Sequence, residues 1–162
     1  YSLKLKEYPV MDIFCISAGF LLRLESGGAA YGVVVSEWLF LSVFFLALFL
    51  SAGKRLAEKS SLGSGAGAHR KVLTAYPDGV LEGSMYLAGS AALVTYTMYV
   101  ITRHSSLLRD TVPLCCFGLL RYLLQVRSGK NGDPTLTLTG DPVMLAVGTA
   151  WAVLTGCGIY GQ

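Results

Sequence analysis

The feature that most constrains this chain is an almost uninterrupted apolar run from Trp38 to Leu50. Together with its neighbours it reaches about 20 residues, which is enough for a helix to cross the hydrocarbon core of a bilayer. A helix suits that environment because it satisfies its own backbone hydrogen bonds. The composition agrees, since only 14% of the residues are charged, against about 25% in a typical soluble domain. The sequence therefore predicts a polytopic helical membrane protein.

Five segments have the character expected of membrane spans. The first carries Asp12 and Arg23, and the fourth carries Arg121. A charge within a span costs roughly 2.5 to 3.5 kcal/mol on insertion scales, so these two helices are expected to turn one face toward protein or a wet cavity. Small residues from Ala88 to Ala92 predict close approach between helices. The expected spans are 10–24, 33–52, 81–102, 111–126 and 142–160, in one all-α transmembrane domain that covers residues 1–162.

The segments between these spans are rich in turn-forming residues. A short glycine-rich turn is expected over 26–32, and a turn-rich connection over 127–141. The longest connection, about 53–79, contains a serine- and glycine-rich stretch typical of flexible linkers. Four cysteines, all within apolar segments, are expected to be small buried hydrophobic residues without a disulfide or a metal: Cys15, Cys115, Cys116 and Cys157.

The placement of the charges predicts an orientation. Five alternating helices bring most basic residues to one side of the membrane, and the positive-inside rule makes that side cytoplasmic. The other side carries only Arg23, Arg103 and Arg109, and would hold the C-terminus. A net charge of +3 gives no reason to expect nucleic acid as a partner. The basic side contains Lys4, Lys6, Lys54, Arg55, Lys59, Arg70, Lys71, Arg127 and Lys130, with Arg121 close by.

The same basic side holds side chains suited to an anion. Lys6, Lys54 and Arg55 are predicted to converge at the mouth of a lipid-embedded cavity, because lysine and arginine both bind phosphate and diphosphate groups. Glu58 lies four residues after Lys54, so in a continuing helix it would pair with Lys54, orient it, or assist Mg²⁺. Asp12 and Arg23, 11 residues apart, would share a helix face. Each charge also has a purely structural interpretation, as a snorkelling side chain, a topology signal or an ion-pair partner.

Several motifs resemble those of the UbiA-type membrane prenyltransferases. The match is closest to one branch, the decaprenyl-phosphate phosphoribosyltransferases, in which a Gly-Lys-Arg-x-Ala-Glu pattern replaces the second aspartate-rich motif of most of the superfamily. That pattern occupies residues 53–58. Further matches, which together cover the chain in order, are Tyr1–Lys6, Pro9–Ile13, Ser17–Arg23, His69–Tyr76, Val112–Pro113, Leu119–Tyr122 and Gly132–Thr135.

The resemblance implies a fold and an activity. The family forms nine spans around a cavity that faces the cytoplasm of the bacterial plasma membrane, and these five spans resemble the last five. Its reaction moves phosphoribose from 5-phosphoribosyl diphosphate to decaprenyl (polyprenyl) phosphate, for cell-wall arabinan precursor synthesis. The resemblance also implies Mg²⁺, held by an aspartate-rich motif on an earlier helix pair. This sequence lacks that motif, so it is expected to be a C-terminal part that is inactive alone.

The resemblance assigns roles to eight residues by position. The predicted catalytic residues are Lys54, Arg55 and Glu58, with Glu58 a possible metal ligand, and the predicted substrate-binding residues are Tyr1, Lys6, Asp12, Arg23 and Arg70.

Two alternative functions stay open: a UbiA-type enzyme that moves a prenyl group from its diphosphate to an acceptor, and a non-enzymatic carrier, channel or scaffold. The missing acidic second motif disfavours the prenyltransferase, and the absence of an inverted repeat disfavours a transporter. Oligomeric state and prenyl chain length stay open.

Overall fold

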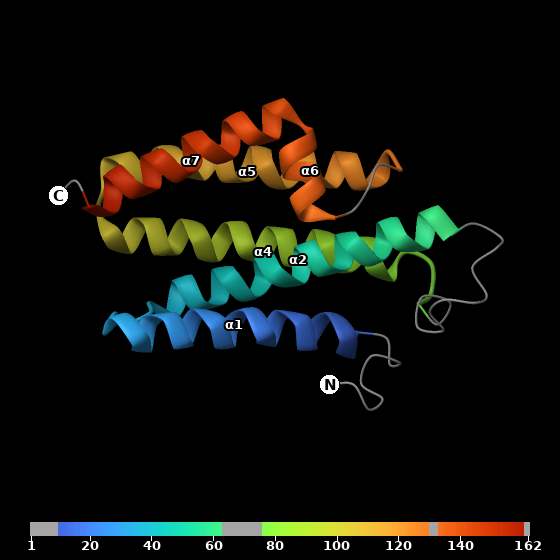
Figure 1. Cartoon of the computed structure of the whole chain (residues 1–162), viewed down its shortest axis with the longest axis horizontal. Helices are drawn as coiled ribbons and strands as arrows, with labels where there is room; N and C mark the ends of the chain where they lie inside the picture. The colour runs from blue at the N-terminus through green and yellow to red at the C-terminus, as the bar shows by residue number, and fades with distance from the viewer. Residues whose placement is uncertain (1–9, 63–75, 130–132, 161–162) are drawn as a thin grey trace.

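The computed structural model describes residues 10–62, 76–129 and 133–160. These ranges are almost entirely helical, without a strand among them. The predicted all-α transmembrane bundle is therefore confirmed. The helices are α1 (Met11–Tyr31), α2 (Glu37–Leu62), α4 (Val80–Arg103), α5 (Ser106–Arg127), α6 (Pro134–Gly140) and α7 (Pro142–Tyr160), as Figure 1 shows.

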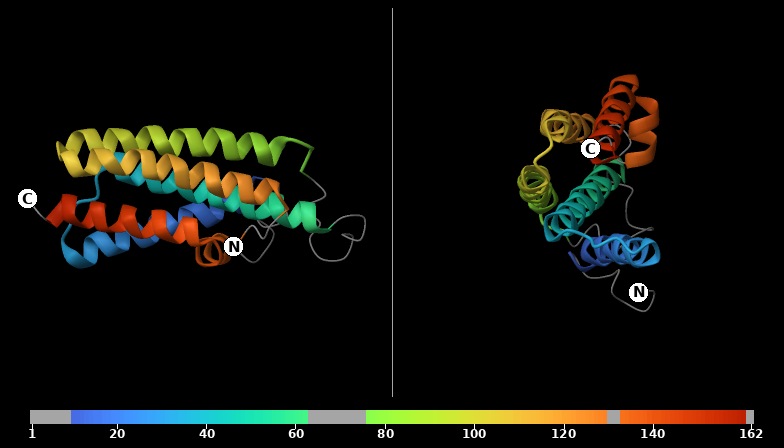
Figure 2. Two further views of the ribbon diagram at one scale, coloured as in Figure 1. Left: turned by 90° about the horizontal axis from the view of Figure 1, so that it is seen from above. Right: turned by 90° about the vertical axis from the view of Figure 1, so that its left-hand side faces the viewer.

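The long helices lie side by side and alternate in direction (Figure 1). α2 packs against α1 on one flank and most extensively against α4 on the other, while α5 packs against α4 and α7. Seen along their length, the helices follow an open arc from α1 to α7 and do not close into a ring (Figure 2). The short helix α6 lies against the beginning of α7 and contacts α5.

Four helices are long and apolar enough to cross a membrane: 11–31, 37–60, 80–103 and 142–159. The remaining predicted span corresponds to α5, which has 22 residues but is more polar. Its polar side chains include Arg121, which is ion-paired to Asp141, and Gln125, which is buried. The expectation that this segment turns a polar face toward protein is therefore confirmed.

Three of the predicted connections are shorter than expected. The turn predicted over 26–32 is wrong, because α1 continues to Tyr31 and ends at Gly32, whose left-handed φ of 64° suits a helix C-terminus. α2 runs on to Leu62, so the first part of the loop predicted at 53–79 is helical. Residues 63–75 of that loop lie outside the described ranges. Within 127–141, Asp133 caps α6 and Pro134 begins it, which is the usual place for proline in a helix.

Small residues allow α2 to approach its neighbours closely, as predicted. Gly89 of α4 lies against the ring of Phe49, where an added Cβ would come within 3.1 Å of Phe49 Cδ2. Gly53 of α2 is tighter, because its Cβ would lie 2.7 Å from Tyr122 Cε1. Ala88, the residue before Gly89, is buried in the core cluster that also contains Phe49 and Tyr122. The core between α2, α4 and α5 is therefore built on close helix contacts.

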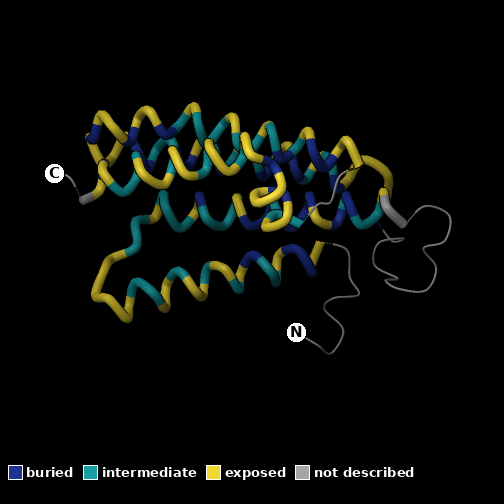
Figure 3. Tube along the Cα trace, turned by 45° about the horizontal axis from the view of Figure 1, so that its top comes forward, coloured by how far each residue is buried: buried dark blue, intermediate teal, exposed yellow. Residues whose placement is uncertain are grey.

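The outer surfaces are strongly apolar. Exposed side chains include Leu22, Val94, Leu120 and Val153. In α1 the described buried residues all lie within its first two turns, and the rest of the helix is more exposed (Figure 3). Surface of this extent requires a bilayer or another protein surface. The expectation that all four cysteines are buried is wrong, since Cys15, Cys115 and Cys116 are only half-buried and Cys157 is exposed.

Replacing Gly53 with alanine tests the close contact between α2 and α5. Alanine gains about 1 kcal/mol in helix propensity, but its methyl group would press on the Tyr122 ring and on Met85, and overpacking costs roughly 1 to 3 kcal/mol. We expect Gly53→Ala to lower the free energy of unfolding in mixed micelles. Gly83→Ala is the matched control, because an added Cβ at Gly83 meets nothing within 4 Å. Equal stability of both variants would contradict this packing.

Candidate functional site

The helices α1, α4 and α7 begin at one end of the bundle, and α2 and α5 end there (Figure 1). The ion pairs of the described residues gather at this end. We call this the polar end. The helix directions agree with the sidedness inferred from the sequence, because Arg23, Arg103 and Arg109 lie toward the opposite end. Which side faces the cytoplasm stays a prediction. The ion pairs at the polar end are Lys54–Asp133, Arg55–Asp12, Arg55–Glu58, Lys59–Asp78, Arg121–Asp141 and Arg127–Glu82.

Arg55 is the centre of a buried network. Its Nε donates to Asp12 Oδ2 at 2.7 Å, and its Nη1 donates to Glu58 Oε2 at 2.7 Å. Asp12 is 3% exposed and Arg55 is 8% exposed. The hydroxyl of Tyr76 donates to Asp12 Oδ1 at 2.8 Å and accepts from Val10 N at 2.6 Å. This buried network therefore ties the start of α1, the end of α2 and the segment before α4 together.

The environment of Tyr76 keeps its hydroxyl protonated. Burial raises the pKa of Tyr76 to about 12, and the hydrogen bond to the Asp12 carboxylate also raises it. Tyr76 is therefore a neutral donor to Asp12 at any physiological pH. A buried carboxylate needs such donors because burial without them is strongly unfavourable.

Arg55 is consequently a structural residue in this geometry. A buried guanidinium is tolerated when carboxylates and hydrogen bonds surround it, and two of its nitrogen atoms here bind carboxylates. A guanidinium has five N–H donors, and these two contacts use two of them, so a direct contact between Arg55 and a substrate phosphate stays a prediction. In the described structure the partners of its guanidinium are Asp12 and Glu58.

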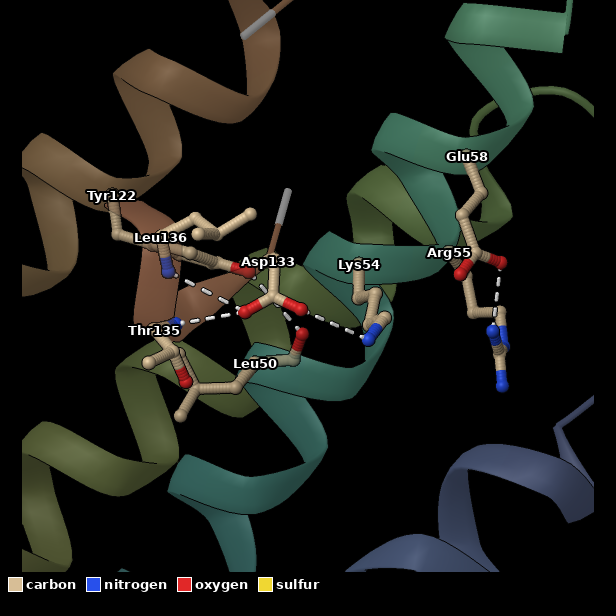
Figure 4. A network of polar contacts seen from close by, with 8 residues as sticks. All are labelled: Leu50, Lys54, Arg55, Glu58, Tyr122, Asp133, Thr135 and Leu136. Carbon is tan, nitrogen blue, oxygen red and sulfur yellow. Dashed lines mark hydrogen bonds and ion pairs between the residues drawn. The ribbon is translucent and has the colours of Figure 1, made fainter. Parts of the chain in front are cut away.

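Lys54 points to a different side of α2 (Figure 4). Its Nζ donates to Asp133 Oδ2 at 3.2 Å, across 79 positions of sequence. Asp133 also caps α6, because its Oδ1 accepts from Thr135 N at 3.0 Å and from Leu136 N at 3.5 Å. The hydrogen bond from Lys54 lowers the pKa of Asp133, and the bond from Thr135 N lowers it further. The pair is half-open to solvent, at 47% exposure for the Lys54 side chain and 32% for Asp133.

One sequence-based expectation is wrong, and another stays a prediction. Lys54 and Arg55 leave α2 in directions about 100° apart, and each is bound by a different acid. Their convergence with Lys6, which lies outside the described residues, stays a prediction. Glu58 does not pair with Lys54, although the helix continues as required; its partner in the ion pair is Arg55, three residues away. Spacing of three and spacing of four are both compatible with contact on a helix, so spacing could not choose between them.

α6 is fastened at its other end as well. Asp141, directly after α6, accepts from Arg121 Nε at 2.7 Å and from the amide of Gln125. The hydrogen bond from Arg121 lowers the pKa of Asp141. Arg121, Gln125 and Asp141 line a polar cavity of about 290 Å³ beside α6. Both ends of this short helix are therefore held to the long helices by carboxylates.

An apolar groove of about 280 Å³ runs between α2, α5, α6 and α7. Its walls include Phe49, Leu119 and Trp151. Leu50 and Pro134 also line it; Leu50 lies one helical turn before Lys54, and Pro134 directly follows Asp133. The hydroxyl of Tyr122, another lining residue, donates to the Leu50 carbonyl at 3.3 Å. The Lys54–Asp133 pair therefore lies beside one end of an apolar groove.

The other predicted site residues do not join Lys54 in the described part of the chain. Asp12 belongs to the buried network around Arg55. Arg23 is exposed about 16 Å farther along α1 than Asp12, with its guanidinium carbon 5.6 Å from the centre of the Phe20 ring. Tyr1, Lys6 and Arg70 lie outside the described residues.

Sequence reasoning missed Asp133 and Tyr76 as partners in these networks. Both lie within segments that resemble the family's motifs, which was the available signal. Their partners are 79 and 64 positions away in the chain, respectively. Contacts at that separation depend on how the helices pack, which single-sequence patterns do not specify.

The described residues do not by themselves fit a Mg²⁺ site. They contain no group of three or more His, Cys, Asp or Glu side chains close enough to hold a metal ion. Asp12 and Glu58, two carboxylates of the predicted site, both bind the guanidinium of Arg55. Mg²⁺ prefers oxygen ligands in octahedral geometry, and the described residues alone do not gather such a set. We therefore assign no metal ligand among them.

Comparison with curated proteins identifies relatives of the chain. A protein of Mycolicibacterium smegmatis is 30% identical over 99% of this chain, and one of Corynebacterium glutamicum is 32% identical over 99%. A Mycobacterium tuberculosis relative is 29% identical over 98%. All three are named decaprenyl-phosphate phosphoribosyltransferase. This chain is similar to decaprenyl-phosphate phosphoribosyltransferases.

The similarity confirms the resemblance that the motifs indicated. It extends over nearly the whole chain, but the chain spans only 54% of the M. smegmatis relative and 50% of the C. glutamicum relative. No family model matches the sequence. The activity of the whole protein is therefore a matter for proposal.

Removing the carboxylate of Asp12 tests the buried network. Asp12→Ala leaves Arg55 with Glu58 as its carboxylate partner, and breaking a buried pair costs roughly 3 to 5 kcal/mol. We expect a loss near the lower limit, about 3 kcal/mol, in unfolding measured in mixed micelles. Asp78→Ala, which removes a carboxylate from the exposed pair with Lys59, should change stability little. Asp12→Leu combined with Arg55→Leu should recover most of the loss; a fully additive loss would contradict the proposed coupling.

Acid should loosen the attachment of α6. The pKa values of Asp133 and Asp141 are lowered by Lys54 and Arg121, respectively, from the ordinary value of 3.8. A carboxyl group whose pKa is lower in the folded state stabilises the fold above 3.8, and this contribution disappears as the pH falls through the folded pKa. We expect the Tm in detergent to fall between about pH 5 and about pH 2. Asp141→Asn should show a shallower fall, and an unchanged slope would contradict this role.

Proposed function

We propose that the full-length gene product is an integral-membrane transferase that moves phosphoribose from 5-phosphoribosyl diphosphate to a polyprenyl phosphate. The observation that carries this proposal is the position of Lys54 beside one end of an apolar groove, in a chain similar to proteins named for that reaction. The polar end would face the cytoplasm of a bacterial plasma membrane. The product would serve cell-wall arabinan precursor synthesis.

The groove and the lysine match the two parts of a polyprenyl phosphate. Its isoprenoid tail is apolar and needs apolar walls, such as those of Phe49, Leu119 and Met144. Its head is a phosphate monoester that needs a cation at the membrane edge, and a lysine ammonium binds phosphate as a point charge. Tail and head would therefore occupy the groove and its Lys54 end, respectively.

The chemistry needs little from the protein beyond placement. An oxygen of the lipid phosphate attacks C1 of the ribose; the bond from C1 to the diphosphate oxygen breaks, and diphosphate leaves with the electron pair. A phosphate monoester with a second pKa near 6 is already largely ionised at neutral pH, so no general base is required. Lys54 would hold the nucleophile in line with C1, and holding two reactants in the right geometry can supply a large part of the rate of a displacement.

The charge of the leaving diphosphate has to be stabilised by other groups. Mg²⁺, which the resemblance implies, would supply this stabilisation when bound, although the described residues do not by themselves form its site. Tyr1, Lys6 and Arg70 stay predicted substrate-binding residues. Arg55, Asp12 and Glu58 would act through the scaffold, since they fix the ends of α1 and α2 on which Lys54 depends.

A transfer assay tests the proposal. The full-length protein in detergent would receive 5-phosphoribosyl diphosphate labelled in the ribose, together with polyprenyl phosphate. We expect the label to enter the lipid extract. Lys54→Met should lower kcat/KM at least about tenfold, the order of effect of losing one charge-assisted contact to a phosphate. Lys59→Met is the matched control, because Lys59 lies on the same helix but pairs with the exposed Asp78.

The alternatives have distinct outcomes in the same assay. Transfer only from a prenyl diphosphate to an acceptor would support a prenyltransferase and contradict the proposal. Absence of either transfer would support a non-enzymatic membrane protein. Full activity of Lys54→Met would leave the reaction intact but overturn the assignment of the phosphate site.

A further inference from the structure

We propose that Asp133 is a positioning residue, which holds the ammonium group of Lys54 at the end of the apolar groove where the lipid phosphate binds. This inference rests on the proposed function, and it gives a role to a residue outside the set that the sequence singled out. Asp133 would not touch the reacting atoms. It would act through Lys54.

The geometry gives Asp133 control over a mobile side chain. Lysine carries a flexible four-carbon stem with large rotamer entropy, and the Lys54 side chain is 47% exposed. In the described structure its Nζ donates to Asp133 Oδ2 at 3.2 Å. An ammonium group has three donors, so this contact uses one and leaves capacity for an anion. Asp133 thus selects one direction for a side chain that would otherwise sample many.

Asp133 is itself well placed to do this. Its other carboxylate oxygen accepts from the backbone of Thr135 at 3.0 Å, which fixes the carboxylate at the start of α6. The far end of α6 is held by Asp141, bound to Arg121 at 2.7 Å. Pro134 and Leu138 of the same helix line the apolar groove. One short element therefore forms part of the groove wall and also sets the position of the cation at its end.

A carboxylate near a phosphate also repels it. The size of this repulsion decides whether Asp133 strengthens or weakens binding of the lipid phosphate. Asp133 would repel the lipid phosphate, but the side chain is 32% exposed and water and salt screen interactions between exposed charges. The Lys54 cation lies between the two anions and offsets the repulsion. Against this stands the rotamer freedom that an unrestrained lysine must lose on binding. We therefore expect the positioning effect to be larger.

The decisive variant is Asp133→Asn. Asparagine is as good a helix N-cap as aspartate, so it retains the start of α6 and a hydrogen-bond acceptor but removes the charge that holds Lys54. In the full-length protein we expect the KM for polyprenyl phosphate to rise about three- to fivefold, with kcat nearly unchanged, in keeping with the loss of one half-exposed ion pair. Asp78→Asn, which removes the carboxylate from the Lys59 pair at the same end, should leave KM unchanged. An unchanged or lower KM in Asp133→Asn would overturn the proposal.

A double-mutant cycle separates positioning from a purely structural role. The dissociation constant of polyprenyl phosphate would be measured by equilibrium binding to the protein in nanodiscs, which requires no turnover. If Asp133 acts through Lys54, Asp133→Asn adds nothing in a Lys54→Met background. A threefold effect that persists there would mean that the Asp133 charge acts independently of Lys54, and would overturn the proposal. Failure of the proposed function is distinguishable, because the unmodified protein would then transfer no phosphoribose.

Discussion

Burial of a guanidinium group at the end of a lipid-facing bundle is the constraint on which the rest of this structure depends. A charge taken out of water is tolerated only with close opposite charges and hydrogen bonds around it. Arg55 receives them from Asp12 of α1 and Glu58 of its own helix, and Tyr76 completes the set by donating to Asp12. Three segments far apart in the sequence must therefore meet at one point. The register of α1 against α2 follows from that meeting.

Because Arg55 points toward α1, where it binds Asp12, helix geometry turns the preceding residue, Lys54, to a different side of α2. On that side α6 supplies Asp133 (Figure 4). The two basic residues of one motif therefore have different surroundings. One holds the scaffold together from a buried position, and the other stands half-exposed beside an apolar groove, where a phosphate can reach it. Of the two cations in this motif, Lys54 is the accessible one and Arg55 is buried.

The short helix α6 links the two halves of the candidate site. It occupies a stretch that sequence composition marks only as turn-rich, yet carboxylates at both ends bind it to α2 and α5. Its Pro134 and Leu138 line the groove that it forms with α2, α5 and α7. Similarity to curated proteins named decaprenyl-phosphate phosphoribosyltransferase extends through this region, since it covers nearly the whole chain. Under the proposed function, the groove and Lys54 at its end would bind the tail and the phosphate of the lipid substrate, respectively.

The sequence by itself determined the class of fold and the end of the bundle at which most basic residues lie. Long apolar blocks leave the backbone no alternative to helices in a bilayer, and the charges concentrated between these blocks indicate which helix ends lie together. The motifs around Lys54 also identified the relatives correctly. Only the tertiary structure decided the partners: Arg55 with Asp12, Lys54 with Asp133, and Glu58 with Arg55 in place of Lys54. The physical reason is that a periodic pattern specifies which face of a helix a residue occupies. An ion pair between distant segments depends instead on how the helices pack, and no periodic pattern in the sequence specifies that packing.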